Sequence, residues 1–359
     1  MNSLKTVVFA AIAAIAGASP AAAQVEIETP KAAFILYGKI SDGGWTLAQE
    51  KARRDLADQF DMDIPYVENV ASTNEAVANV LDLYISRGYN VLIGGTYGFS
   101  DGFLAAAEAH PDLAFVNISG VTKAPNLESF YARTYEGWYL AGMAAASASS
   151  SDRIGIVAAF PLPYVVWDVN AFALGAQSVK PGIETVVTFT NSWSDPVKET
   201  QLAKSLIENG VDVLATAMDS TAVPVVAEAA GLHSIGYKSD MSSAAPEGML
   251  TSVVYNWSGA LIPIFEEIKA GSWESKGSPL YGMQEGVIEV LELRAGVPAD
   301  AAEKIAEARA QIEAGTLSPF EGPIYAQDGS LKVAEGAQMS VEALWGSDFL
   351  VQGVQGNLK

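Results

Sequence analysis

The amino-acid sequence predicts an α/β fold with two doubly wound parallel-sheet lobes joined by a hinge. Short apolar segments alternate with helical stretches from residue 32 to residue 237. This alternation restarts after the polar run at residues 149–152. Alternating strands and helices are typical of parallel sheets with helices on both faces. The chain of 359 residues is also long enough for two domains rather than one.

The first series of elements covers residues 32 to 134. Its apolar segments, bounded by Gly, Asn and Asp, have the length and composition of buried strands. The stretches between them have the length of helices. The predicted strands are Ala32–Tyr37, Ile64–Val67, Asn90–Gly94, Leu113–Ile118 and Glu128–Thr134, and the predicted helices are Leu47–Asp58, Asn74–Arg87 and Asp101–Ala109.

An Ala-rich helix is predicted at Tyr139–Ala148, before the polar run, and the second series then repeats the same alternation. Its predicted strands are Arg153–Phe160, Glu184–Thr190, Val211–Ala217 and Ser234–Tyr237. Its predicted helices are Val165–Ser178, Pro196–Asn209 and Ala222–Ala230.

Later elements could return to either lobe. They are the strands Met249–Tyr255 and Gly286–Leu293, the helices Ser258–Ala270 and Pro298–Ala314, and a hairpin at Asp328-Gly329. We assign residues 24–135 and 241–290 to the N-terminal lobe, and residues 136–240 and 291–359 to the C-terminal lobe.

The N-terminus has the pattern of a cleavable signal peptide. Lys5 precedes an apolar stretch at residues 6–18, and Ala21-Ala22-Ala23 before Gln24 forms a small-residue cleavage site. The apolar stretch is too short for a permanent membrane span. We therefore predict that residues 1–23 are a signal peptide and that the mature chain is exported to the periplasm.

Composition excludes several classes of function. The sequence has no cysteine, which excludes disulfides, thiolate catalysis, thiolate metal sites and a lipid anchor on an N-terminal cysteine. Its formal net charge of −21 argues against nucleic acid and anionic membranes as partners. Two histidines leave little for a transition metal, and no phosphate-binding glycine motif is present. We expect a soluble, lipid-free monomer that carries no metal and no cofactor.

The segment Lys31–Glu50 reads as strand, Gly-rich loop and helix, with Trp45 at the end of the loop. In open α/β sheets, ligands bind beyond the carboxyl ends of the strands. Trp45 can stack there on a flat ligand, with Gly44 beside it, and Asp42 can accept hydrogen bonds from the ligand. The alternative is that Trp45 packs in the core between helix and sheet.

Similar side chains follow strands of the second series. Each of them can alternatively be a helix cap or an ordinary loop residue. Together they favour a flat, nitrogen-rich, neutral ligand in a cleft between the lobes. These candidates are Trp167, Asn170, Trp193, Asp219, Lys238 and Asp240.

A hydrolase is the alternative from another class of protein. Residues 98–102 match the G-x-S-x-G pattern of a nucleophile elbow around Ser100, between a strand and a helix. A catalytic triad needs an acid and then a histidine downstream. His110 follows too soon, and His233 would need an acid such as Asp212 or Asp219. We therefore predict a binding protein, with no catalytic residue.

Several segments in this order resemble the basic membrane protein family, the substrate-binding proteins of ABC transporters that include purine nucleoside receptors. The resemblance covers nearly all of the mature chain. It implies a type I periplasmic-binding-protein fold, an ABC permease as partner, and Tyr97 near the ligand. The segments are Gly38–Trp45, Gly94–Phe99, Glu136–Gly142, Asn170–Gly175, Trp193–Glu199, Gly236–Asp240 and Phe320–Val333.

The departures from this family concern the groups that hold a ribose. Where the family's nucleoside receptors place Asp, Asp and Lys, this chain has Leu36, Lys238 and Tyr255. Sugar hydroxyls without partners are costly in a closed site. The resemblance, with Trp45 at the stacking position, therefore implies a purine base such as adenine, or a similar flat heterocycle, and a nucleoside as the alternative.

Overall fold

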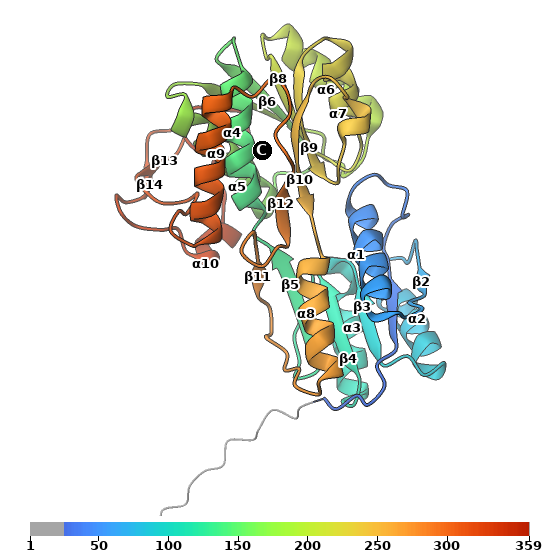
Figure 1. Ribbon diagram of the computed structural model, residues 1–359. Helices are drawn as coiled ribbons and strands as arrows, with labels where there is room; N and C mark the ends of the chain where they lie inside the picture. Colours follow the sequence, from blue (N-terminus) through green and yellow to red (C-terminus); the bar gives the residue numbers. More distant parts are fainter. Residues whose placement is uncertain (1–24, 359) are drawn as a thin grey trace, which may run out of the picture.

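The computed structural model describes residues 25–358, which form two α/β lobes (Figure 1). The predicted signal peptide, residues 1–23, lies outside the described residues. The first lobe, at the bottom of Figure 1, begins with a βα series that runs to residue 132. Its elements are β1 (Ala32–Ile35), α1 (Trp45–Phe60), β2 (Tyr66–Val67), α2 (Asn74–Ser86), β3 (Val91–Gly94), α3 (Ser100–Ala109), β4 (Ala114–Ile118) and β5 (Leu127–Ala132).

The second lobe repeats the βα alternation and adds helices on its outer face. Its elements up to residue 290 are α4 (Thr134–Ala148), β6 (Arg153–Ala158), α5 (Pro163–Val179), β7 (Glu184–Phe189), α6 (Pro196–Glu208), β8 (Val213–Ala217), α7 (Ala222–Ala229), β9 (His233–Lys238), β10 (Met249–Tyr255) and β12 (Ile288–Val290). Helix α9 (Ala299–Glu313) packs on α4.

The two sheets share one strand order, which confirms the predicted fold class. The first sheet has the order β2-β1-β3-β4-β5-β11, with β11 at Leu280–Tyr281, and all its strands are parallel. The second has the order β15-β7-β6-β8-β9-β10-β12, with β15 at Val354–Gln355, and its edge strand β12 is antiparallel. In each sheet, the strands that follow in sequence are added first on one side of the starting strand and then on the other. The switch lies between β1 and β3 in the first sheet and between β6 and β8 in the second. Such switch points leave a crevice at the carboxyl ends of the strands.

Within residues 25–358 the chain crosses between the lobes three times: from β5 to α4, from β10 to α8 (Ser258–Lys269), and from β11 to β12. Helix α8 lies against α1 of the first lobe, where Phe265 and Phe60 have ring centroids 4.7 Å apart. The assignment of all of residues 241–290 to the N-terminal lobe is therefore wrong, because β10 and β12 pair in the second sheet. Strand pairing is a long-range choice that a local pattern does not record.

Local signals explain several element boundaries. Helix α6 begins where the Asp195 side chain accepts a hydrogen bond from the backbone N–H of Lys198, with Pro196 at the first helical position. Helices α4 and α5 cross closely because Gly142 and Gly175 lie at the crossing. A Cβ atom on either glycine would overlap a backbone carbonyl of the other helix.

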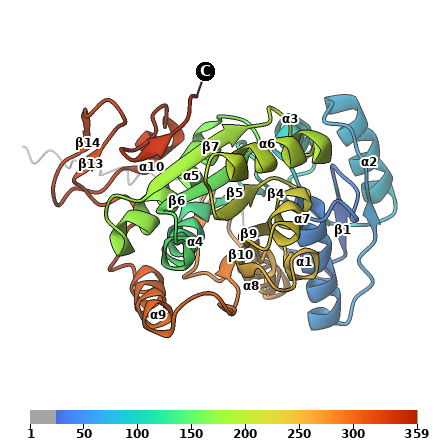
Figure 2. The ribbon, with the colours of Figure 1, turned by 90° about the horizontal axis from the view of Figure 1, so that it is seen from above.

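The C-terminal segment, residues 319–358, folds back onto the second lobe (Figure 2). It contains the predicted hairpin as β13 (Ile324–Tyr325) and β14 (Leu331–Val333), then α10 (Val341–Trp345) and β15 (Val354–Gln355). Strand β15 pairs in parallel with β7. In the part of the chain that the structure describes, we find no helix with the length and apolar character needed to cross a membrane.

Candidate ligand-binding cavity between the lobes

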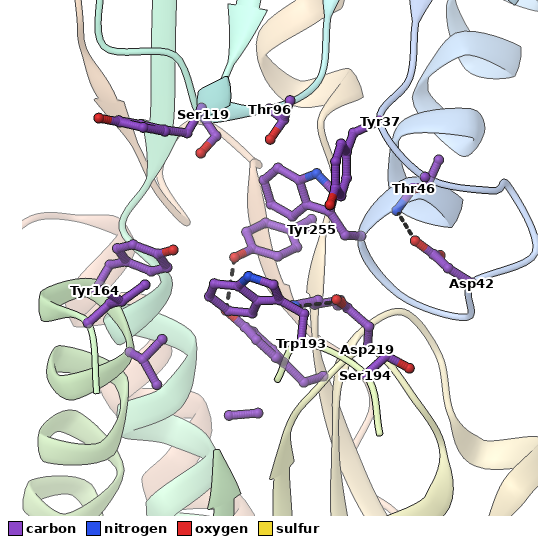
Figure 3. Close-up of a pocket in the computed structure, with 18 of the residues that line it drawn as sticks. Tyr37, Asp42, Thr46, Thr96, Ser119, Tyr164, Trp193, Ser194, Asp219 and Tyr255 are labelled. Atoms are coloured by element: carbon purple, nitrogen blue, oxygen red, sulfur yellow. Dashed lines mark hydrogen bonds and ion pairs between the residues drawn. The ribbon is translucent and has the colours of Figure 1, made fainter. Parts of the chain in front are cut away.

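A cavity of about 570 Å³ lies between the lobes, at the carboxyl ends of the strands of both sheets (Figure 3). Its volume falls within the range that is typical of small-molecule sites. The residues that line it are Tyr37, Gly38, Asp42, Trp45, Thr46, Ser72, Thr96, Tyr97, Gly98, Ser119 and Tyr131 from the first lobe, and Leu162, Tyr164, Val165, Asp168, Trp193, Ser194, Ala217, Asp219, Tyr237, Lys238 and Tyr255 from the second.

Trp45 forms part of the first-lobe wall and is the first residue of α1. Its indole N–H donates a hydrogen bond to the carbonyl oxygen of Gly95 at 2.9 Å. Its ring meets the edge of Tyr255, with centroids 5.4 Å apart. These contacts fix the orientation of an indole that is only partly buried, so Trp45 faces the cavity instead of being enclosed in the core.

Asp42 lines the same wall, but its carboxylate is already hydrogen-bonded to backbone N–H groups. Its carboxylate accepts hydrogen bonds from the N–H groups of Gly44, Thr46 and Leu47, at 2.9, 2.7 and 3.1 Å. A carboxylate stabilises a helix N-terminus by satisfying its free N–H groups. Asp42 therefore holds the beginning of α1, and with it Trp45, in place.

The second-lobe wall consists of an aromatic pair and an ion pair. The rings of Tyr164 and Trp193 are nearly parallel, at 7° with centroids 6.1 Å apart. The ammonium of Lys238 lies 5.4 Å from the Trp193 ring centroid and binds the Asp219 carboxylate at 2.5 Å. Because both charged groups are largely buried and paired, this wall has little net charge.

The floor of the cavity is a chain of hydroxyl groups that ends on a buried carboxyl. Asp168 accepts hydrogen bonds from the hydroxyls of Thr134 at 2.5 Å and Tyr237 at 3.2 Å. The Tyr237 and Tyr255 hydroxyls are 2.8 Å apart, and that of Tyr131 is 3.5 Å from Tyr255. This row of hydroxyl groups therefore joins Asp168 and two tyrosines of the second lobe to a tyrosine of the first.

Burial determines the protonation states of this floor. It raises the pKa of Asp168 well above its usual range, against the opposing effect of the hydrogen bonds from Thr134 and Tyr237. It likewise raises the pKa values of Tyr131, Tyr237 and Tyr255. Burial also raises the pKa of Tyr164 to about 12. The phenols therefore stay neutral at physiological pH, and each can donate and accept a hydrogen bond.

The two lobes touch directly at the mouth of the cavity. The Ser239 hydroxyl of the second lobe donates a hydrogen bond of 2.5 Å to the carbonyl oxygen of Gly43 in the first. Gly44 is buried against Asp219, and a Cβ atom on it would lie only 2.9 Å from the Asp219 Oδ1. Glycine at this position thus allows the first-lobe loop to approach the second lobe closely.

The structure brings six of the ten predicted site residues to the cavity lining: Asp42, Trp45, Tyr97, Trp193, Asp219 and Lys238. The other four do not line it. Gly44 packs behind the wall, as described above. Trp167 is fully buried, and its indole N–H donates to the Thr134 hydroxyl at 2.9 Å.

Asn170 and Asp240 serve the backbone instead of the cavity. The Asn170 amide donates to the carbonyl oxygen of Phe349 and accepts from the N–H of Val351, each at 2.9 Å, so it anchors the C-terminal segment. Asp240 is exposed and accepts a hydrogen bond from the Ser242 N–H at 2.9 Å. Their positions after strands suggested ligand contact, but local turns and the C-terminal segment use their polar groups.

Asp168 and most of the tyrosines that line the cavity are not among the site residues predicted from the sequence. One signal for two of them is present in the sequence. Tyr164 and Asp168 are four residues apart on the same helix, so they share a helix face. No comparable local signal marks Tyr131 and Tyr237, which lie inside strands of different lobes.

Ser100 lies outside the cavity lining. Its hydroxyl donates to the carbonyl oxygen of Tyr97 at 2.7 Å and accepts from the Val121 N–H at 3.1 Å. It is the first residue of α3 and does not cap that helix through its side chain. The G-x-S-x-G pattern therefore corresponds to a turn that the Ser100 side chain stabilises.

The fold and the cavity together define a two-lobed solute-binding protein. Comparison with known sequences names the family: residues 29–318 match the PnrA-like substrate-binding proteins of ABC transporters. This chain belongs to that family, as the resemblance in the sequence indicated.

Relatives in this family carry different ligand names. The chain is 36% identical to a purine-binding protein of Brucella abortus, over 97% of this chain and 99% of the relative. It is 34% identical to a putative glucose-binding protein of an ABC transporter from Haloferax volcanii, over 84% and 76% of the two chains. The fold is also similar to that of a solute-binding protein from Conexibacter woesei, with a TM-score of 0.71 and 19% identity over 81% of this chain and 98% of that one.

The raised pKa of Asp168 predicts a specific pH dependence. Between the usual value of 3.8 and its own higher pKa, the folded state retains a proton that the unfolded chain has released. The contribution of Asp168 to stability is therefore complete below about pH 4 and is lost as the pH rises through the folded-state pKa. Asp168→Asn cannot titrate, so its free energy of unfolding should improve relative to wild type with rising pH. Urea unfolding of both proteins from about pH 4 to pH 8 measures this difference; a constant or falling difference would contradict it.

Proposed function

We propose that this protein is the periplasmic component of an ABC importer and that it binds a free purine base, with adenine as the first candidate, between its lobes. The observation that carries the proposal is the cavity itself, in which aromatic rings from both lobes surround a few polar groups. Flat heterocycles stack on such rings, and their ring nitrogens and exocyclic groups pair with phenols and a carboxyl. The identity with a purine-binding protein over nearly the whole chain supports the same ligand class.

The charges in the cavity oppose a nucleotide as ligand. Among the residues that the structure describes, Lys238 is the single cationic side chain in the lining, and Asp219 neutralises it. Asp42 and Asp168 add acidic groups. A phosphate needs cations or a cluster of free N–H donors, so a neutral ligand fits better.

A base fits better than a nucleoside because the groups expected to hold a ribose are absent or engaged. Leu36 is buried in the core, away from the cavity lining. Lys238 is paired with Asp219, and the Tyr255 hydroxyl bonds with Tyr237. A sugar would leave several hydroxyls without partners in a closed cavity, and each would lower the affinity.

Hinge closure is the mechanism that this cavity favours. A ligand that touches Trp45 of the first lobe and Trp193 of the second contributes binding energy only when the lobes are together. Such a ligand shifts the population toward the closed form, which the permease then recognises.

Binding without catalysis is the better interpretation of Ser100. Both hydrogen bonds of its hydroxyl go to backbone groups, and the side chain is not in the cavity lining. A nucleophile needs a base within hydrogen-bonding reach and a substrate beside it. We therefore assign no catalytic role to this serine.

Mass spectrometry of the bound ligand tests the function directly. Protein purified without added ligand is denatured, and the released small molecules are identified. Calorimetry then compares adenine, guanine, hypoxanthine, adenosine and glucose. We expect a purine base to bind at least about tenfold more tightly than adenosine, a difference of about 1.4 kcal/mol. Tighter binding of adenosine would favour the nucleoside alternative, and binding of glucose alone would refute the purine proposal.

Export to the periplasm predicts the mass of the mature protein. Cleavage after Ala23 should leave a chain that begins at Gln24 and carries no lipid, because the sequence has no cysteine to acylate. Intact-mass analysis of a periplasmic extract measures the mature mass. Recovery of the full-length chain from the cytoplasm would contradict this localisation.

Trp45→Ala tests the aromatic platform. Stacking of a base on an aromatic side chain is worth about 1–3 kcal/mol in single-stranded nucleic-acid complexes. We therefore expect the dissociation constant for adenine to rise by roughly ten- to a hundredfold, at about 1.4 kcal/mol per tenfold. Calorimetry and thermal melting on the same preparation separate lost binding from lost folding.

Leu47→Ala provides the matched control for this substitution. Leu47 lies in the first turn of the same helix, is 38% exposed and is not part of the cavity lining. Its truncation should leave adenine binding unchanged. Normal affinity in a folded Trp45→Ala protein would remove Trp45 from the site.

A further inference from the structure

The C-terminal segment begins where the match to the family ends. The family match stops at residue 318, and residues 319–358 then fold along the second lobe. Three features hold the segment in place: the pairing of β15 with β7, the two hydrogen bonds of Asn170, and a 2.8 Å hydrogen bond from Gln177 to the carbonyl oxygen of Gln352. The segment is thus packed as an integral part of the second lobe.

Trp345, the last residue of α10, brings this segment to the back of the cavity wall. Its ring centroid lies 4.9 Å from that of Trp167, 5.9 Å from that of Tyr131 and 6.3 Å from that of Tyr164. Tyr131 and Tyr164 both line the cavity, and Trp345 does not. Trp345 therefore contacts two wall residues without itself lining the cavity.

These two tyrosines belong to different lobes. Tyr131 lies in β5 of the first sheet, and Tyr164 lies in the first turn of α5 in the second lobe. Their rings meet edge to face, with centroids 5.6 Å apart, and Tyr164 also stacks with Trp193. Trp345 thus adds a third ring to an aromatic contact that spans the lobes.

We propose that Trp345 is a positioning residue for the ligand-binding cavity and that the C-terminal segment sets the shape of its aromatic wall. Trp345 holds the Tyr164 ring parallel to Trp193 and supports its contact with Tyr131 when the lobes are closed. This inference rests on the proposed function for the identity of the ligand and adds the C-terminal segment to the parts of the protein that shape the binding site.

Contacts with neighbouring aromatic rings hold the Tyr164 side chain in place. It is only partly buried, and its place in the first turn of α5 leaves its ring free to change rotamer unless neighbours hold it. Trp193, Tyr131 and Trp167 each contact the Tyr164 ring, and Trp345 adds the contact from the C-terminal segment. Loss of Trp345 opens a flank, so Tyr164 must then be ordered at the moment of ligand binding, which lowers affinity.

The experiment compares three substitutions in the full chain with adenine as the probe. Trp345→Ala should raise the dissociation constant by about three- to tenfold, the range expected for one lost aromatic pair. Trp345→Phe should restore most of the affinity, because it retains a ring. Val341→Ala is the control, since Val341 begins the same helix and is 46% exposed; it should bind as wild type does. Unchanged affinity in folded Trp345→Ala would overturn the proposal.

A double-mutant cycle separates positioning from general stability. If Trp345 acts through Tyr164, Trp345→Ala should have little further effect on affinity in a Tyr164→Ala background. A merely structural role would instead give equal losses in both backgrounds, and that outcome would overturn the proposal.

Hydrogen exchange of the ligand-free protein tests the positioning role of Trp345 without depending on a purine ligand. The N–H groups of Val165 and Val166 both bond to the carbonyl oxygen of Leu162 in the first turn of α5. Trp345→Ala should speed their exchange, and Val341→Ala should not. If wild type binds no purine, the proposed function fails, while unchanged exchange in Trp345→Ala would overturn the positioning role independently.

Discussion

The chain of hydroxyl groups that ends on the buried Asp168 carboxyl is the constraint on which the cavity depends. Tyr237 and Tyr255 lie on adjacent strands of the second sheet, and Tyr131 approaches them from the first. Buried polar groups need partners, so these side chains satisfy one another and hold the strand ends in register. The polar floor is thus continuous across the boundary between the lobes, at the point where a ligand would join them.

Aromatic rings surround this polar floor and shield it from water. Trp45 is oriented by the Gly95 carbonyl, and Trp193 lies between Tyr164 and the Lys238 ammonium. These rings remove water from Asp168 and the phenols, which raises their pKa values and strengthens their hydrogen bonds. The same dry surroundings favour a flat ligand with a few well-placed polar atoms over a highly hydroxylated one.

Sequence reasoning identified the strand ends correctly but not every side chain that reaches the cavity. Trp45, Trp193 and Asp219 follow strands and line it. The same rule points to Trp167 and Asn170, yet Trp167 is buried in the core and the C-terminal segment occupies the Asn170 amide. Position after a strand indicates the right end of the sheet, whereas rotation along a helix and long-range partners decide what a side chain contacts.

The sequence by itself determined the βα alternation, the two lobes, the family and the strand ends that carry the cavity, because hydrophobic periodicity and turn residues are local properties. The tertiary structure alone decided that β10 and β12 join the second sheet, since pairing depends on which edge the returning chain meets. It also brought Tyr131 to Tyr237 and Tyr255 and placed Trp345 behind Tyr164. Those neighbours are distant in the chain, so only the closure of the two lobes and the packing of the C-terminal segment bring them together.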